Sequence, residues 1–188
     1  MINGILQVFN LRLSRVFPRH SIGFIKKTFG NKELVGAEIG VYKGENSLSI
    51  LKTLKIKKLY LIDPYKKYNN YDNPYDENIF DFEKIMKKAK KLLKKYPVEF
   101  IRKFSIDASV GIEKLDFVYI DGNHTYDFVK EDIQTYWNKL KKGGVLAGHD
   151  IENGEYEDNN GVVDAVMEFV YKNKLRLFIQ SPDWWIVK

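Results

Sequence analysis

Apolar residues along this chain follow two patterns, short unbroken runs and longer stretches with helical spacing. Short runs between polar residues predict buried strands, whereas apolar positions three and four residues apart predict amphipathic helices. We therefore expect strands at residues 35–41, 58–63, 98–104, 115–121, 144–149, 175–180 and 184–187, with helices at 46–55, 78–96, 125–140 and 162–171. This alternation predicts an α/β fold in which helices cover both faces of a mostly parallel sheet.

The last two predicted strands are joined by a short Ser-Pro-Asp turn. A connection of this length cannot cross over a sheet, so the two strands should pair antiparallel. A mostly parallel sheet that ends in an antiparallel hairpin is unlike the sheet of a dinucleotide-binding Rossmann domain.

A glycine turn, E-I-G-V-Y-K-G-E-N-S, joins the first predicted strand to its helix. Gly40 and Gly44 allow the chain to turn tightly and a ligand to approach closely. Asp63 ends the second predicted strand, and an acid about 20 residues after such a turn is well placed to bind a ribose. Because Tyr42 replaces the second glycine of G-x-G-x-x-G, the spacing argues against NAD.

Glu38, two residues before Gly40, is expected to direct negative charge into the mouth of this turn. Negative charge disfavours a pyrophosphate and favours a cationic ligand, such as S-adenosylmethionine with its ammonium and sulfonium groups. An ordinary strand-to-helix turn is the alternative interpretation of Gly40 and Gly44. Glu38 and Asp63 in register with the glycines favour a cofactor site.

Composition and charge narrow the class of protein. The 188 residues contain no cysteine, which excludes a disulfide framework and thiolate metal sites. No apolar run is long enough to span a bilayer, so we expect a cytoplasmic protein. The net charge of +6 comes largely from lysines in residues 84–95, which alternate with apolar residues at helical spacing. A solvated helix face explains these lysines better than nucleic-acid binding does, because arginines and aromatic residues are not interleaved.

Several motifs together resemble the class I S-adenosylmethionine-dependent methyltransferases, within them the small-molecule O-methyltransferase branch called methyltransferase domain family 24. These motifs are the glycine turn, L-I-D-P-Y, L-D-F-V-Y-I-D-G-N-H-T-Y, K-K-G-G-V-L-A-G-H-D and G-V-V-D-A-V-M-E-F-V. The resemblance implies a Rossmann-like fold with a seven-stranded sheet whose last strand is antiparallel. We expect this domain to span residues 31–188, after a helical extension at residues 1–30.

The resemblance also implies S-adenosylmethionine as the cofactor. The first motif would surround its methionine moiety, Asp63 its ribose, and Ser105 and Asp107 its adenine. The full set implied to bind the cofactor is Glu38, Gly40, Tyr42, Gly44, Asp63, Pro64, Ser105, Asp107 and Asp121.

Two polar clusters, Asp121-Gly122-Asn123-His124 and His149-Asp150, lie at the ends of two consecutive predicted strands. Ligands of open α/β sheets bind beyond the carboxyl ends of the strands, so both clusters should face one crevice. Methyl transfer to a hydroxyl of a small molecule or a glycan precursor requires removal of the hydroxyl proton.

Two routes to proton removal stay open. Asp121 and Asp150, with His149 as a further candidate, would hold Mg²⁺ or Mn²⁺, which lowers the pKa of the hydroxyl. Alternatively, His124 is the general base, because its ordinary pKa lies near neutral pH. A turn-forming role for Asp121 and a packing role for His149 are the structural alternatives.

The remaining segments suggest partners. Apolar residues from Ile2 to Phe17 follow helical spacing beside several arginines, which is typical of a helix that binds a membrane surface, a dimer partner or the cofactor cleft. The polar segments 65–78 and 151–160 are expected to form the acceptor pocket, because loops of this length are usually functional. An RNA or protein methyltransferase and a non-catalytic protein that keeps the cofactor fold are the alternative functions.

Overall fold

The computed structural model describes residues 18–67, 81–151 and 160–188. Residues 1–17, where the sequence predicts an amphipathic helix, lie outside the described residues. So do most of the two segments expected to form the acceptor pocket.

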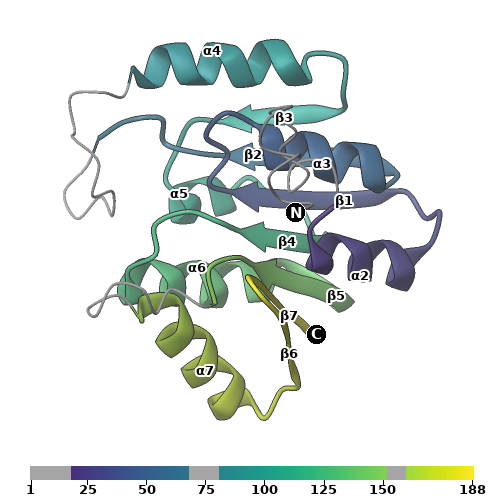
Figure 1. The fold of residues 1–188 in the computed structure, drawn as a ribbon, viewed down its shortest axis with the longest axis vertical. Helices are drawn as coiled ribbons and strands as arrows, with labels where there is room; N and C mark the ends of the chain where they lie inside the picture. Colours follow the sequence, from purple (N-terminus) through teal and green to yellow (C-terminus); the bar gives the residue numbers. More distant parts are fainter. Residues whose placement is uncertain (1–17, 68–80, 152–159) are drawn as a thin grey trace, which may run out of the picture.

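A seven-stranded sheet runs through the domain in the order β3-β2-β1-β4-β5-β7-β6 (Figure 1). Strands β1 to β5 pair in parallel, and β7 pairs antiparallel with both β5 and β6. This topology confirms the predicted sheet and its antiparallel last strand. The strands are β1 (Leu34–Ile39), β2 (Ile56–Ile62), β3 (Val98–Ile101), β4 (Leu115–Ile120), β5 (Leu140–Gly148), β6 (Leu177–Gln180) and β7 (Asp183–Val187).

Helices cover both faces of the sheet, as predicted. One buried cluster joins the sheet to α2 (His20–Phe29), α3 (Glu45–Thr53) and α4 (Phe82–Leu93). A second cluster joins the opposite face to α5 (Ser105–Ser109), α6 (Tyr126–Lys139) and α7 (Gly161–Asn173). Since the strands are buried on both faces, they read as continuous apolar runs.

Two element boundaries differ from the sequence prediction. Strand β3 ends at Ile101, three residues early, and the chain turns into the short helix α5, which was not predicted. Strand β5 begins at Leu140 rather than Gly144, and its pairing with β4 is irregular near that start. Gly143 has a φ of +77°, which allows the strand to accommodate this irregularity.

Helix α2 is built into the core, although it falls within the predicted N-terminal extension. Its residues Ile22 and Ile25 are fully buried against the sheet. Its N-terminus is held by buried Asp183 of β7, which accepts hydrogen bonds from the Ser21 backbone N–H at 3.0 Å and from the Ser21 hydroxyl. A carboxylate at this position satisfies an unpaired helix donor and complements the helix dipole. Within the described ranges, no helix has the length and apolarity needed to cross a bilayer.

Candidate functional site

The candidate site lies at the carboxyl edge of the four strands at the middle of the sheet. Four backbone N–H groups just beyond these strands donate to the last carbonyl of a neighbouring strand, and they belong to Gly40, Asp63, Asp121 and His149. The backbone hydrogen bonding thus continues one residue past each strand. The four residues therefore lie side by side in the order Asp63 after β2, Gly40 after β1, Asp121 after β4 and His149 after β5. The chain leaves β1 toward β2 and returns to β4, which makes the β1–β4 boundary the topological switch point.

The glycine turn lies directly against the end of β4. Gly40 has a φ of +83°, and a Cβ there would stand 1.9 Å from the Asp121 carbonyl oxygen. Tyr42 and Gly44 also have positive φ values, +48° and +78°. Tyr42 therefore adopts the backbone conformation expected of the glycine that it replaces, which non-glycine residues rarely do. Its side chain is 42% exposed beside the crevice edge.

Asp63 is the anchor of this turn. One carboxylate oxygen accepts the backbone N–H groups of Val41 and Tyr42, at 3.0 and 2.9 Å, and the other accepts that of Tyr65 at 2.8 Å. Burial raises the pKa of Asp63, and these three hydrogen bonds oppose the rise. Ribose binding by Asp63 stays a prediction, as does a role for Pro64, whose carbonyl oxygen faces Arg102 at 3.4 Å.

Glu38 does not extend into the mouth of the turn, contrary to expectation. Its side chain is fully buried on β1, where the Asn46 amide donates to it at 2.9 Å and the Ser47 hydroxyl donates to its other oxygen. Burial raises its pKa to about 8, so the carboxyl is mostly protonated at neutral pH. The cause is the tight packing of α3 over the end of β1, which periodicity alone does not reveal.

The predicted adenine pocket contains an acid that sequence reasoning missed. The Ser105 hydroxyl donates to Asp132 of α6, which is 4% exposed, whereas Asp107 is exposed on α5. Burial raises the pKa of Asp132 to about 7. A carboxyl on the apolar face of a helix, between Val129 and Ile133, was the signal that could have identified it.

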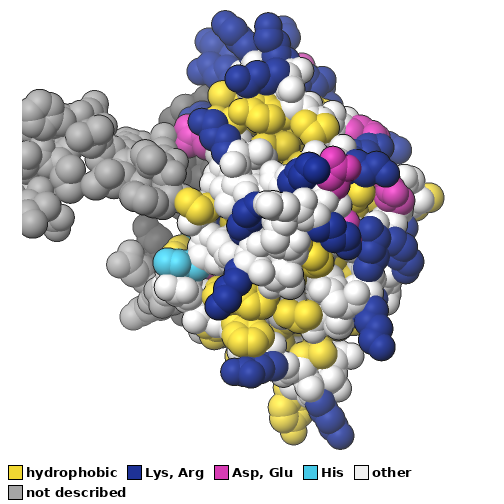
Figure 2. Space-filling view, turned by 90° about the vertical axis from the view of Figure 1, so that its right-hand side faces the viewer, with side chains coloured by type: hydrophobic (Ala, Val, Ile, Leu, Met, Phe, Trp, Pro, Cys, Tyr) yellow, Lys and Arg dark blue, Asp and Glu magenta, His cyan; other side chains and the backbone are white. Residues whose placement is uncertain are grey.

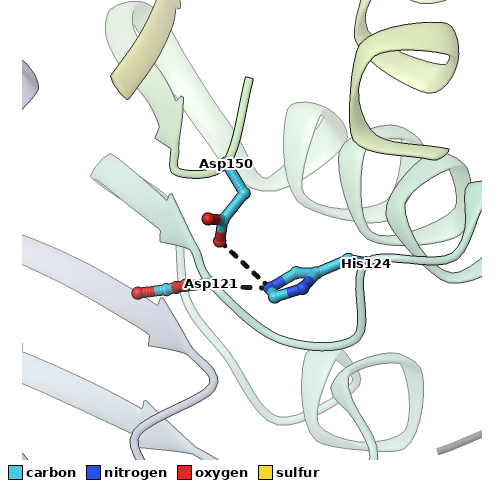
Figure 3. Close-up of side chains that lie close together, drawn as sticks. All are labelled: Asp121, His124 and Asp150. Carbon is cyan, nitrogen blue, oxygen red and sulfur yellow. Dashed lines mark ion pairs between the residues drawn. The ribbon is translucent and has the colours of Figure 1, made fainter. Parts of the chain in front are cut away.

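On the other side of the switch point, Asp121, His124 and Asp150 converge (Figure 3). The His124 Nε2 lies 3.2 Å from an Asp150 carboxylate oxygen and 4.0 Å from one of Asp121. One ligand atom from each residue lies within 4.8 Å of the others, which is the spacing of a candidate cation site. Burial raises the pKa of Asp121 to about 6, and the guanidinium of Arg19 opposes this rise.

His149 stands next to this cluster rather than within it. Its Nδ1 lies 3.0 Å from the same Asp150 oxygen that faces His124. His124, His149 and Asp121 line one small pocket together with Trp184. The structure thus brings together Asp121, His124 and His149, the three residues predicted for catalysis. In the candidate cation site, however, the third residue beside Asp121 and Asp150 is His124 and not His149.

Local backbone structure fixes His124 at the crevice. The Asn123 side chain accepts the backbone N–H of Thr125 at 2.8 Å, an Asx turn that leads into α6. Gly161, the first residue of α7, lies so close that a Cβ there would be 2.4 Å from the His124 carbonyl oxygen. His124 is therefore held between the starts of two helices.

Arg19 is a site residue that motif reasoning did not assign. It immediately precedes α2, its guanidinium lies over the Tyr119 ring at 5.6 Å from the centroid, and its Nη2 is 3.4 Å from Asp121. In the sequence, Arg19 is one of the arginines close to the apolar residues from Ile2 to Phe17. Its place in the crevice follows from the docking of α2, which local sequence does not specify.

A family model described as "Methyltransferase domain" matches residues 37–151, which contain the glycine turn, Asp63 and the whole acid cluster. The chain belongs to the class I S-adenosylmethionine-dependent methyltransferases. The methyltransferase is also 26% identical over 157 residues to the uncharacterized protein R132 of Acanthamoeba polyphaga mimivirus. This match covers 80% of the chain and 66% of the viral relative.

Solved structures share the fold at low sequence identity. The O-methyltransferase NovP is 15% identical with a TM-score of 0.61, and the match covers 89% of the methyltransferase and 78% of NovP. An rRNA methylase from Streptococcus thermophilus is 17% identical with a TM-score of 0.60, at coverages of 90% and 94%. The TDP-rhamnose 3'-O-methyltransferase CalS11 is 11% identical with a TM-score of 0.62, at coverages of 97% and 83%. These likenesses establish the fold and leave the acceptor open.

The crevice of the methyltransferase fits the methionine end of the family's cofactor. Two buried polar atoms next to the glycine turn and the acid cluster lack a hydrogen-bond partner among the described residues, the Asn46 Oδ1 acceptor and the Arg19 Nη1 donor. The methionine end of the cofactor offers the complementary groups, an ammonium that can donate to Asn46 and a carboxylate that can accept from Arg19. Asp121, close to the Arg19 guanidinium, suits a ligand that also carries positive charge.

Proposed function

We propose that this methyltransferase transfers the methyl group of S-adenosylmethionine to a hydroxyl of a small molecule or of a sugar or glycan precursor. The observation that carries the proposal is the cluster of Asp121, His124 and Asp150 beside the switch point. An oxygen acceptor must lose a proton during transfer, and the cluster places an imidazole and two carboxylates where that proton can be taken up.

The bound cofactor supplies an electrophilic methyl group, and the described residues would prepare the acceptor. His124 would donate its Nε2–H to Asp150, 3.2 Å away, and accept the hydroxyl proton at its other ring nitrogen. The Asp150 carboxylate would then stabilise the imidazolium, while His149, 3.0 Å away, orients that carboxylate from the other side. Asp121 stands across the site and adds negative charge close to the transferring group.

A divalent cation is a further component of this proposal. Two carboxylates and one imidazole form a donor set suited to Mg²⁺ or Mn²⁺, with Mn²⁺ favoured by the imidazole. Such a cation would lower the pKa of the acceptor hydroxyl. The metal and base routes compete, because a cation bound at Nε2 would replace the proton by which His124 binds Asp150 in the base route.

The first experiment is calorimetric titration of S-adenosylhomocysteine, with and without Mg²⁺, followed by turnover on hydroxylated acceptors with methyl-labelled cofactor. We expect submillimolar binding and label transfer to oxygen. In His124→Ala, excess Mn²⁺ should restore turnover if the residue is a ligand, and no metal concentration should restore it if the residue is the base. Wild-type protein that binds neither cofactor form would exclude the proposal.

RNA is the second candidate acceptor, supported by one surface. The lysines of α4 and of the turn after it are exposed, and Figure 2 shows Lys and Arg gathered at this upper end of the molecule. Such a surface binds polyanions in a salt-dependent manner. RNA binding that weakens steeply with salt, together with label transfer to RNA, would favour this candidate over the small-molecule acceptor.

A further inference from the structure

The position of Arg19 is fixed by contacts on two sides. Asp183 binds the N-terminus of α2 through Ser21, so the residue before the helix is held where β4 ends and β7 begins. The guanidinium then lies over the Tyr119 ring, which is fully buried. A cation over an aromatic ring is attracted to its face, so the arginine is already ordered.

The ion pairs of Arg19 leave one donor group unused. Its Nη2 lies 3.4 Å from an Asp121 oxygen, and its Nη1 lies 3.9 Å from an Asp183 oxygen, which is too far for a hydrogen bond. Nη1 is buried and has no hydrogen-bond partner among the described residues. Because a buried unsatisfied donor is costly, this atom marks a place where a ligand acceptor would bind favourably.

A complementary acceptor, the Asn46 Oδ1 of α3, lies over the neighbouring strand β1. Glu38 of β1 is paired in register with Tyr119 of β4, so their side chains project from the same face of the sheet. Arg19 covers Tyr119, and Asn46 donates to Glu38 at 2.9 Å. The Asn46 Oδ1 is buried and, within the described part of the chain, has no donor. One unused cationic donor and one unused acceptor therefore contact adjacent strands, β4 and β1, on a single face of the sheet.

We propose that Arg19 binds the carboxylate of the methionine moiety of S-adenosylmethionine, while Asn46 accepts a hydrogen bond from the ammonium group of the same moiety. This inference rests on the proposed use of that cofactor and adds a residue before α2 to its site. A guanidinium suits a carboxylate because it can donate two parallel charge-assisted hydrogen bonds. Helix α2 thereby becomes part of cofactor recognition as well as of the core.

The test compares S-adenosylmethionine with decarboxylated S-adenosylmethionine, which keeps the ammonium and sulfonium groups. In Arg19→Ala, calorimetry should show about ten- to a hundredfold weaker binding of S-adenosylmethionine and unchanged binding of the decarboxylated form. Arg19→Lys should give an intermediate loss, because it keeps the charge without the forked geometry. His20→Ala, at the exposed next residue, is the matched control and should bind both ligands like wild type.

Other outcomes would overturn the inference. Equal losses for both ligands would mean that Arg19 acts by holding Asp121 or α2, and thermal melting of each variant identifies that case. Unchanged cofactor binding with a raised KM for an anionic acceptor would assign Arg19 to the acceptor instead. Wild-type protein that binds neither ligand would refute the proposed function itself, which is a separate failure. If Arg19→Ala does not fold, Arg19→Gln makes the same comparison without the charge.

Discussion

Asp63 and Asp121 follow strands on either side of β1, yet the structure holds their carboxylates differently. Asp63 accepts three backbone N–H groups and so fixes the glycine turn. Asp121 faces side chains across longer distances, 3.4 Å to the Arg19 guanidinium and 4.0 Å to the His124 imidazole. The Asp63 side of the crevice is therefore bonded to its own backbone, whereas the Asp121 side is held by longer contacts between side chains that a ligand can rearrange.

Gly40 lies at the contact between the glycine turn and the end of β4, and its replacement should have the largest effect on stability. Gly40→Ala would press a Cβ against the Asp121 carbonyl in a left-handed backbone conformation, which should destabilise the fold by about 3–5 kcal/mol. Gly143→Ala is the control, because Gly143 has a similar φ of +77° and open space around it. Urea unfolding of both variants measures the difference, and equal losses would mean that the close approach carries no cost.

On the Asp121 side of the crevice, Asp150→Asn should weaken divalent cation binding at least about tenfold, because the amide lacks the charge that a hard cation requires. Calorimetric titration with MnCl₂ measures this affinity. Asp107→Asn, at an exposed acid on α5, is the control and should bind Mn²⁺ like wild type. Unaltered Mn²⁺ affinity in Asp150→Asn would remove the metal from the proposed site.

On the Asp63 side of the crevice, Asp63→Ala and Asp63→Asn should separate the role of the carboxylate in stability from its role in binding the cofactor. Alanine leaves three backbone donors unpaired and should cost about 1–3 kcal/mol of stability, whereas asparagine keeps one acceptor oxygen. Both variants should bind S-adenosylhomocysteine more weakly if Asp63 holds the ribose. Chemical denaturation and calorimetry report the two effects, and wild-type affinity in Asp63→Asn would argue that Asp63 only shapes the turn.

Glu38 should give the smallest effect, seen in the pH dependence of stability. Its pKa is raised from 4.5 to about 8, so the folded state binds this proton more tightly than the unfolded state. The resulting stability is complete below the unfolded pKa and is lost as pH rises through the folded pKa. Glu38→Gln should therefore reduce the loss of stability between pH 5 and 8 by at least about 1 kcal/mol, as measured by denaturation at both pH values. Equal pH dependence in the two proteins would contradict this account.

The sheet and most of the site were accessible to sequence reasoning because local patterns encode them. Buried runs marked the strands, and the residues just after β1, β2, β4 and β5 marked the crevice. The surroundings of Glu38 were not accessible, since they depend on how α3 packs over β1. Arg19 and Asp183 were missed for the same reason, because they meet only after α2 docks against β7.

The bond between Ser21 and Asp183 joins residues 162 positions apart. During synthesis, α2 is translated long before β7, the strand that holds its N-terminus. The apolar face of α2 therefore cannot be fully buried until the later strands of the sheet have been made. Ribosome-bound chains that stop short of Asp183 would carry the glycine turn and the acid cluster but not a fixed Arg19. The crevice is therefore completed late, after the rest of the domain has been translated.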